Sequence, residues 1–205
     1  MRKLIICLLL LCAHPVWAQD VPLFEAVVAG RLAEVERLLT GGAKVDARNE
    51  DAETPLYVAV EKGNAAIASL LLKKGADVKT RTENGETVLH AAALQGDPKL
   101  MQLLLDRGAE PNRANRDGER PLFWAAAAGH GRVAQLLLDR GAEVNAVDER
   151  GNTALHGAVD GGHETAAWLL LSQGANRGLR NGAGDTALDI ARRRGYGDLA
   201  KLLER

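Results

Sequence analysis

Residues 153–185 read TALHGAVDGGHETAAWLLLSQGANRGLRNGAGD, and the 33 residues before them follow the same plan. In both stretches a glycine lies nine residues after the first position, and a run of three leucines and a Gly-Ala pair follow it. The period recurs along the chain, with first positions at Thr54, Thr87, Arg120, Thr153 and Thr186. A fixed period of this length is typical of a solenoid of stacked repeats and not of a globule with one core. We therefore expect an extended surface whose function is recognition.

The pattern predicts two helices in each repeat, followed by a hairpin-like finger. The threonine at the start can cap the first helix, proline suits its first turn, and glycines end the helices. Inner helices are expected near 55–62, 88–95, 121–128, 154–161 and 187–194. Outer helices are expected near 65–73, 98–107, 131–139, 164–172 and 198–204. An atypical opening unit, with helices near 22–29 and 32–40, is predicted to form the N-terminal cap.

The residues inside each period resemble the ankyrin repeat. Thr54-Pro55-Leu56-Tyr57 and Thr153-Ala154-Leu155-His156 are versions of the T-P-L-H start of that family, and Gly141-Ala142-Glu143-Val144-Asn145 is similar to its G-A-D-V-N loop. The resemblance covers Val21 to Arg205. It implies an all-α solenoid of six stacked ankyrin repeats that is L-shaped and has a concave binding face. It also implies a non-catalytic module that binds another protein, and it names no target.

The first 18 residues have the organisation of a secretory signal peptide. Arg2-Lys3 form a short basic start, residues 4–13 are apolar, and Val16-Trp17-Ala18 fit a signal peptidase site. We expect cleavage between Ala18 and Gln19 and a periplasmic location. The remaining domain would hold repeats at about 19–50, 51–83, 84–116, 117–149, 150–182 and 183–205. A lipoprotein is the less favoured alternative, because no small residues precede either cysteine.

Removal of this leader would change the composition of the chain. It carries two basic residues and no acidic one, which leaves 24 basic against 27 acidic residues and a net charge of −3. It also holds both cysteines, Cys7 and Cys12, so the mature chain would need no disulfide in an oxidising compartment. Negative charge, with basic and acidic residues mixed, disfavours nucleic-acid binding. No second apolar run approaches the length of a membrane span.

The histidines of the mature chain are interpreted as structural. His90 and His156 hold the fourth position of the start, and His130 and His163 follow the mid-repeat glycine. Equivalent positions in neighbouring repeats lie on the order of 10 Å apart, whereas metal ligands converge within about 2.1 Å of one ion. We expect no cofactor, no metal and no catalytic residue. The alternative function is a carrier of a small ligand, haem or metal through His130, His163 and Trp124.

Aligned repeats allow the expected concave surface to be compared row by row. The residue before each start is acidic in four of five repeats and forms an acidic row at the finger bases. The last positions of the inner helices are small and apolar in the middle of the stack and charged toward its ends, which is typical of a protein-binding patch. The candidate partner-binding residues are Glu53, Glu86, Leu94, Gln95, Arg116, Glu119, Phe123, Trp124, Ala127, Ala128, Asn152 and Asp160.

The third full repeat departs most from the pattern. Arg120 replaces the capping threonine, a loss of about 1 kcal/mol, and Phe123 and Trp124 follow it. Because the residues equivalent to Trp124 in the adjacent repeats are Ala91 and Gly157, we expect its ring to fill the space they leave and in part to line the groove beside Phe123. Local rules that are broken together often mark a functional site. This repeat is therefore predicted to be the centre of recognition.

A second tryptophan, Trp168, is expected on an outer helix in a row of exposed residue types. Two interpretations stay open for it: a contact on the convex face, or a lone exposed apolar residue with no function. Nothing in the sequence demands an oligomer, and we expect a monomer in the absence of the partner.

Overall fold

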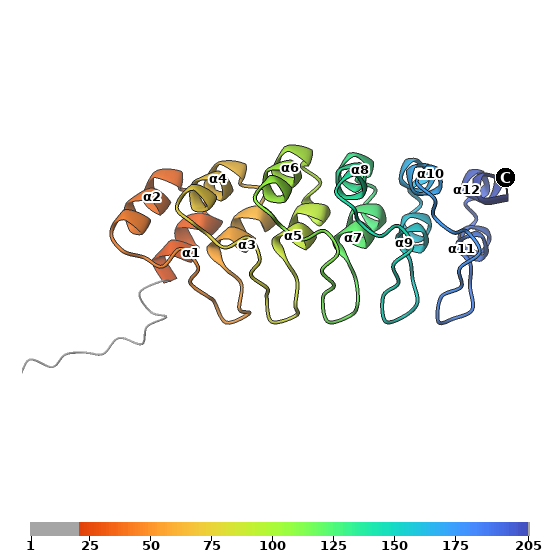
Figure 1. Ribbon diagram of the computed structural model, residues 1–205, viewed down its shortest axis with the longest axis horizontal. Coiled ribbons are helices and arrows are strands. Elements are labelled where there is room, and N and C mark those ends of the chain that lie inside the picture. Colours follow the sequence, from red (N-terminus) through yellow and green to blue (C-terminus); the bar gives the residue numbers. More distant parts are fainter. Residues whose placement is uncertain (1–20, 205) are drawn as a thin grey trace, which may run out of the picture.

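The computed structural model describes residues 21–204, so the predicted leader and its cleavage site lie outside the described residues. Twelve helices in this part form six pairs that stack side by side along one axis (Figure 1). The inner layer consists of α1 (Val21–Val28), α3 (Pro55–Glu61), α5 (Val88–Gln95), α7 (Pro121–Ala127), α9 (Ala154–Asp160) and α11 (Ala187–Arg194). The outer layer consists of α2 (Leu32–Thr40), α4 (Ala65–Lys73), α6 (Pro98–Asp106), α8 (Gly131–Asp139), α10 (Glu164–Ser172) and α12 (Gly197–Glu204). These bounds agree with the predicted helices to within one residue at each end.

The loops between successive pairs project to one side of the helices as a row of fingers (Figure 1). One backbone hydrogen bond joins each finger to the next, for example from the Arg116 N–H to the Asn84 carbonyl at 2.8 Å and from the Glu149 N–H to the Asp117 carbonyl at 2.9 Å. In the described part of the chain there is no sheet, only an isolated bridge between Val147 and Thr153. The prediction of an all-α repeat solenoid is confirmed.

Threonine caps begin the inner helices as predicted. The Thr54 hydroxyl accepts from the Tyr57 N–H at 3.3 Å, and the Thr153 hydroxyl accepts from the His156 N–H at 3.4 Å. Arg120 makes no side-chain cap to α7, so the expected loss of the cap in this repeat is confirmed. The threonine side chains supply hydrogen bonds to the first N–H groups of each helix, which have no partner inside the helix.

The core runs the length of the stack as a ribbon between the two layers. Each full repeat except the last buries a leucine of its outer helix completely, at Leu71, Leu104, Leu137 and Leu170. Each full repeat also buries an alanine of its inner helix, at Ala59, Ala92, Ala125, Ala158 and Ala191. Small side chains let the inner helices approach closely, so each repeat buries its apolar face mainly against its neighbours.

A ring from one repeat lies over a glycine of the repeat before it. A Cβ at Gly96 would be 2.5 Å from the His130 ring, and a Cβ at Gly129 would be 2.6 Å from the His163 ring. Both glycines also have positive φ, at 81° and 76°. No other residue type fits these positions without strain, and His130 and His163 therefore close the joint between repeats.

Candidate functional site

The acidic row at the finger bases is positioned by a turn that recurs with the repeat. The Asn115 side-chain oxygen accepts from the N–H groups of Asp117 and Glu119 at 3.0 and 2.9 Å. Asn49, Asp148 and Asn181 form the same turn in their repeats. Asn and Asp side chains stabilise such turns by standing in for a backbone acceptor. The Asn or Asp at this turn was not among the predicted residues, although its recurrence at Asn49, Asn115, Asp148 and Asn181 is visible in the sequence.

Trp124 is the largest side chain on the concave face of the stack. Its indole Nε1 donates to the Glu119 carboxylate at 2.7 Å, and its ring meets the His90 ring edge to face with centroids 5.3 Å apart. The space above Gly157 is taken by a different ring, because a Cβ there would be 3.1 Å from Phe123. The prediction that Trp124 fills this space is therefore wrong: Phe123 does so, and Trp124 turns toward the finger base.

These rings border a shallow depression of about 370 Å³. Leu94, at the end of α5, stands beside it with 56 % of its surface exposed. Half of the predicted partner-binding residues meet here, and they come from two inner helices and one finger base. They are Leu94, Glu119, Phe123, Trp124, Ala127 and Ala128. An apolar floor with one carboxylate at its edge can accept an apolar side chain and fix the direction of its approach.

The other six predicted residues lie outside this depression. Glu53 and Glu86 occupy the acidic row of earlier repeats, and Arg116 is exposed on a finger. Gln95 lies over Gly63, where a Cβ would be 2.3 Å from its amide nitrogen. Asn152 donates to Asp148 and accepts from Asn181, at 3.1 and 2.9 Å. Asp160 accepts from the Arg194 guanidinium at 2.7 Å. The last three therefore have structural partners.

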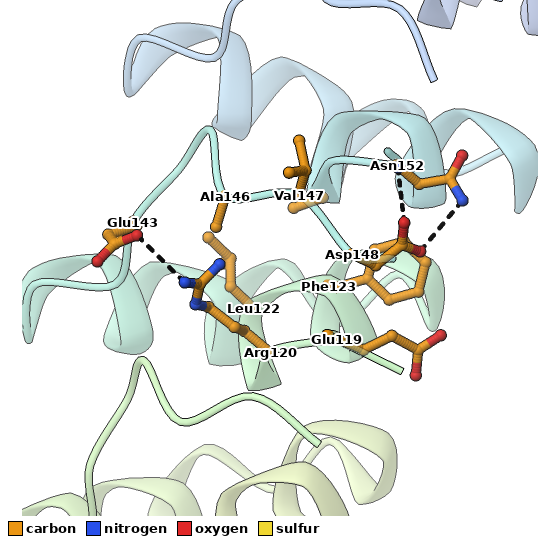
Figure 2. Close-up of a pocket in the computed structure, with 11 residues that line it drawn as sticks. Glu119, Arg120, Leu122, Phe123, Glu143, Ala146, Val147, Asp148 and Asn152 are labelled. Atoms are coloured by element: carbon orange, nitrogen blue, oxygen red, sulfur yellow. Dashed lines mark hydrogen bonds and ion pairs between the residues drawn. The ribbon is translucent and has the colours of Figure 1, made fainter. Parts of the chain in front are cut away.

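On the opposite side of Phe123, a second hollow is almost filled by side chains. Figure 2 shows Arg120 reaching toward Glu143, at 3.6 Å, and Asn152 bonded to Asp148. Arg120 also donates from Nε to the Asn112 carbonyl at 3.1 Å. Only about 10 Å³ remains free there. Arg120 thus ties α7 to the loops on either side of it, and the hollow has no room for a ligand.

Burial favours the neutral form of His90 and His156, and their hydrogen bonds fix one tautomer. His90 Nδ1 faces the Thr87 N–H at 3.0 Å, and Nε2 faces the Glu119 carbonyl at 3.1 Å. A backbone N–H can only donate, so Nδ1 accepts and Nε2 carries the proton. Burial lowers the pKa of His90 from 6.5 to about 4, against the opposing effect of the Glu119 carbonyl. Burial also lowers the pKa of His156.

The surroundings of the histidines do not support the alternative that the protein carries a small ligand, haem or metal. His130 directs Nε2 to the Leu94 carbonyl at 3.0 Å, and its ring lies over Gly96. Between residues 21 and 204, no three His, Cys, Asp or Glu side chains are grouped so that they could hold a metal ion. Over the same range, none of the helices combines the length and the hydrophobicity that a bilayer crossing demands.

A wider apolar depression of about 710 Å³ lies on the opening repeat and was not predicted. It is lined by Val21, Phe24, Val28 and Arg48, among others, and Val28 is 57 % exposed. Val28 occupies the same row as Leu94, so the row comparison held a signal for it. The opening unit therefore caps the stack with an apolar concave side.

Comparison with known proteins identifies the architecture. A family model for ankyrin repeats in three copies matches residues 3–82, 23–115, 75–148 and 122–204. Among solved structures, the ankyrin repeat domain of Bcl-3, described as a unique member of the IkappaB protein family, matches with a TM-score of 0.77 and 34 % identity. The match covers 91 % of this chain and 86 % of that one. No curated protein matches the chain. Since 632 solved chains match, the likeness identifies an architecture and not a partner.

Proposed function

Because the chain belongs to the ankyrin-repeat family, whose repeats generally serve as protein–protein interaction modules, we propose that it binds one partner protein through the depression between Leu94 and Trp124. The role is non-catalytic. One observation carries the proposal: Leu94 is mostly exposed beside a half-buried Phe123 and Trp124, on the face that the fingers border. Burial of such a leucine contributes about 2 kcal/mol, and tryptophans at the centre of a patch are frequent anchors of binding.

The partner we propose is an exported protein, and the compartment is the periplasm. Support comes from the basic start, apolar run and peptidase-like residues of the first 18 positions. In that setting the chain would support or inhibit its partner as an accessory, chaperone-like or immunity protein. Sequencing of the exported protein from its N-terminus tests the compartment, and Gln19 is the expected first residue.

The binding site is tested with a variant that fills the depression and a matched variant on the convex face. Residues 19–205 are used to capture the partner from the exported fraction, and binding is then measured with both purified proteins by calorimetry. Leu94→Asp combined with Ala127→Glu should abolish binding, because two carboxylates would be buried without partners. Trp168→Asp on α10 should leave it unchanged. Circular dichroism confirms that each variant is folded.

Two results would contradict the proposed binding site. Wild-type affinity in the folded Leu94→Asp, Ala127→Glu variant would show that the depression is not the binding site. Loss of binding in the Trp168→Asp variant alone would place the site on the convex face.

A further inference from the structure

Three half-buried carboxylates follow one another along the finger bases, and within residues 21–204 the hydrogen bonds that they accept come from neutral groups. Glu53 accepts from the Asn49 amide at 2.7 Å, and Glu86 accepts from the Tyr57 hydroxyl. Glu119 accepts from the Trp124 indole and the Asn115 amide, both through Oε2. Among residues 21–204, none of the three carboxylates is in an ion pair. Three carboxylates thus stand without an ion pair beside the proposed binding site.

The far end of the same surface shows the opposite arrangement. Asp185 holds the equivalent position in the last repeat and pairs with Arg193 at 2.6 Å. Asp160, on the neighbouring inner helix, pairs with Arg194 at 2.7 Å. Asp185 and Asp160 are thus in ion pairs, whereas Glu53, Glu86 and Glu119 are not.

Cations near the three carboxylates are engaged elsewhere or turned outward. Arg48 donates to the Ala52 and Arg81 carbonyls, both at 2.8 Å. Arg81 in turn donates to the Ala114 carbonyl at 2.7 Å, so these two arginines join neighbouring fingers. Lys62 pairs with Glu61 at 2.9 Å, and the charge of Glu53 acts on it more weakly. Arg116 is exposed on its finger.

Tyr57 lies in a negative electrostatic field, which is reflected in its pKa. Its pKa is raised above the ordinary value, first by burial, then by the hydrogen bond to Glu86, and further by the charges of Glu86, Glu53 and Glu61. The phenol therefore stays protonated and donates to Glu86 without neutralising it. A row of carboxylates without ion pairs attracts and orients a positively charged partner.

On the basis of the proposed function, we propose that the partner presents an extended basic segment along this row. Its lysine or arginine side chains pair with Glu53, Glu86 and Glu119, and an apolar residue beyond them enters the depression beside Leu94. The spacing fits a protein chain. Helices of successive repeats pack about 10 Å apart, and three residues of an extended polyproline II segment span about 9 Å and return the side chain to the same side of the segment. The segment therefore carries a basic residue at every third position.

The probe is a short synthetic peptide with lysine at every third position and one leucine near its end. The matched probe has glutamate in place of each lysine. Binding is followed through Trp124 fluorescence in residues 19–205 with Trp168→Phe, which leaves Trp124 as the one tryptophan of that range. The lysine peptide should bind about tenfold more tightly, at about twofold for each of three partly exposed ion pairs. Added salt should reduce the difference.

Variants of the protein test which carboxylates are responsible. Glu86→Gln with Glu119→Gln keeps the shape and the acceptor oxygens, and it should weaken binding of the lysine peptide about fourfold. Glu164→Gln, on the exposed start of α10, removes the same kind of charge from the convex side and should change nothing.

The outcomes separate this inference from the proposed function. Equal binding of both peptides, no binding of either, or full binding by the double glutamine variant would overturn the basic-segment inference. If the captured partner then still required Leu94, the proposed function would stand with a different ligand chemistry. If partner binding ignored the depression altogether, the proposed function itself would fail.

Discussion

Acidification should destabilise this protein through His90 at a pH well above that at which most carboxylates titrate. The ring is fully buried, its Nδ1 accepts from the Thr87 N–H, and its Nε2 donates to the Glu119 carbonyl. A second proton on Nδ1 would point at a backbone N–H. The folded state can accept that proton only by breaking the cap of α5 and by placing a charge in the core.

The size of the effect follows from the two pKa values. The folded pKa of His90 is about 4, and the ordinary value that applies to the unfolded chain is 6.5. The unfolded state therefore takes up the proton first as the pH falls. The stabilising contribution is complete above pH 6.5, declines between pH 6.5 and 4, and is absent below that range. At about 1.4 kcal/mol per pKa unit, the total is about 3 kcal/mol.

Urea unfolding at a series of pH values measures this contribution when wild type is compared with His90→Gln. Glutamine at this position can still bond back to the Thr87 N–H, as in a capping box, but it does not titrate. The difference in unfolding free energy between the two proteins should shrink by about 3 kcal/mol from pH 7 to pH 4. His156→Gln should act in the same direction, because burial lowers the pKa of His156 as well.

A difference that stays constant over this range would refute the reasoning. It would mean that His90 takes up its proton in the folded state without loss, and thus that the ring is not confined to the neutral tautomer by its neighbours.

Three further substitutions test the joints and caps of the stack. Gly174→Ala places a Cβ at φ 86° with nothing within 4 Å and should lower the unfolding free energy by about 1 kcal/mol through backbone strain alone. Gly129→Ala should lower the unfolding free energy by more than Gly174→Ala does, because its Cβ would also lie 2.6 Å from the His163 ring. Equal losses for the two variants in urea unfolding would show that the His163 ring does not close this joint. Arg120→Thr should raise stability by about 1 kcal/mol by restoring the missing cap. A lower midpoint of denaturation would instead show that the bonds from Arg120 to Asn112 and Glu143 outweigh a cap.

The helices and their order were predictable because they depend on a signal that repeats. A threonine cap, a glycine and a leucine run at fixed spacing define each unit several times over, so a departure such as Arg120 does not disturb the assignment. The depression was predictable in outline for the same reason. Leu94, Ala127 and Ala128 are the small or apolar members of rows that are charged elsewhere.

What could not be predicted were the directions of individual side chains. Row alignment gives small neighbours to Trp124 and histidine neighbours to Phe123, yet it is Phe123 that lies over Gly157, while Trp124 turns to Glu119. The ion pairs could not be predicted from row alignment either. Whether an acidic residue in the row meets an arginine depends on side-chain geometry within the repeat, as the contrast between Asp185 and Glu119 shows.

The rings that lie over glycines make the joints between repeats directional, because a side chain of one repeat covers a glycine of the repeat before it. Each internal unit carries both halves of the joint: a glycine that the next unit covers, and a side chain that covers the unit before. Gly96 and His130, or Gly129 and His163, are successive examples. A tandem duplication of one such unit would therefore bring its own compatible joint. The array can lengthen or shorten in whole units without redesign of its interior, and the breadth of surface offered to a partner can change while every joint stays the same.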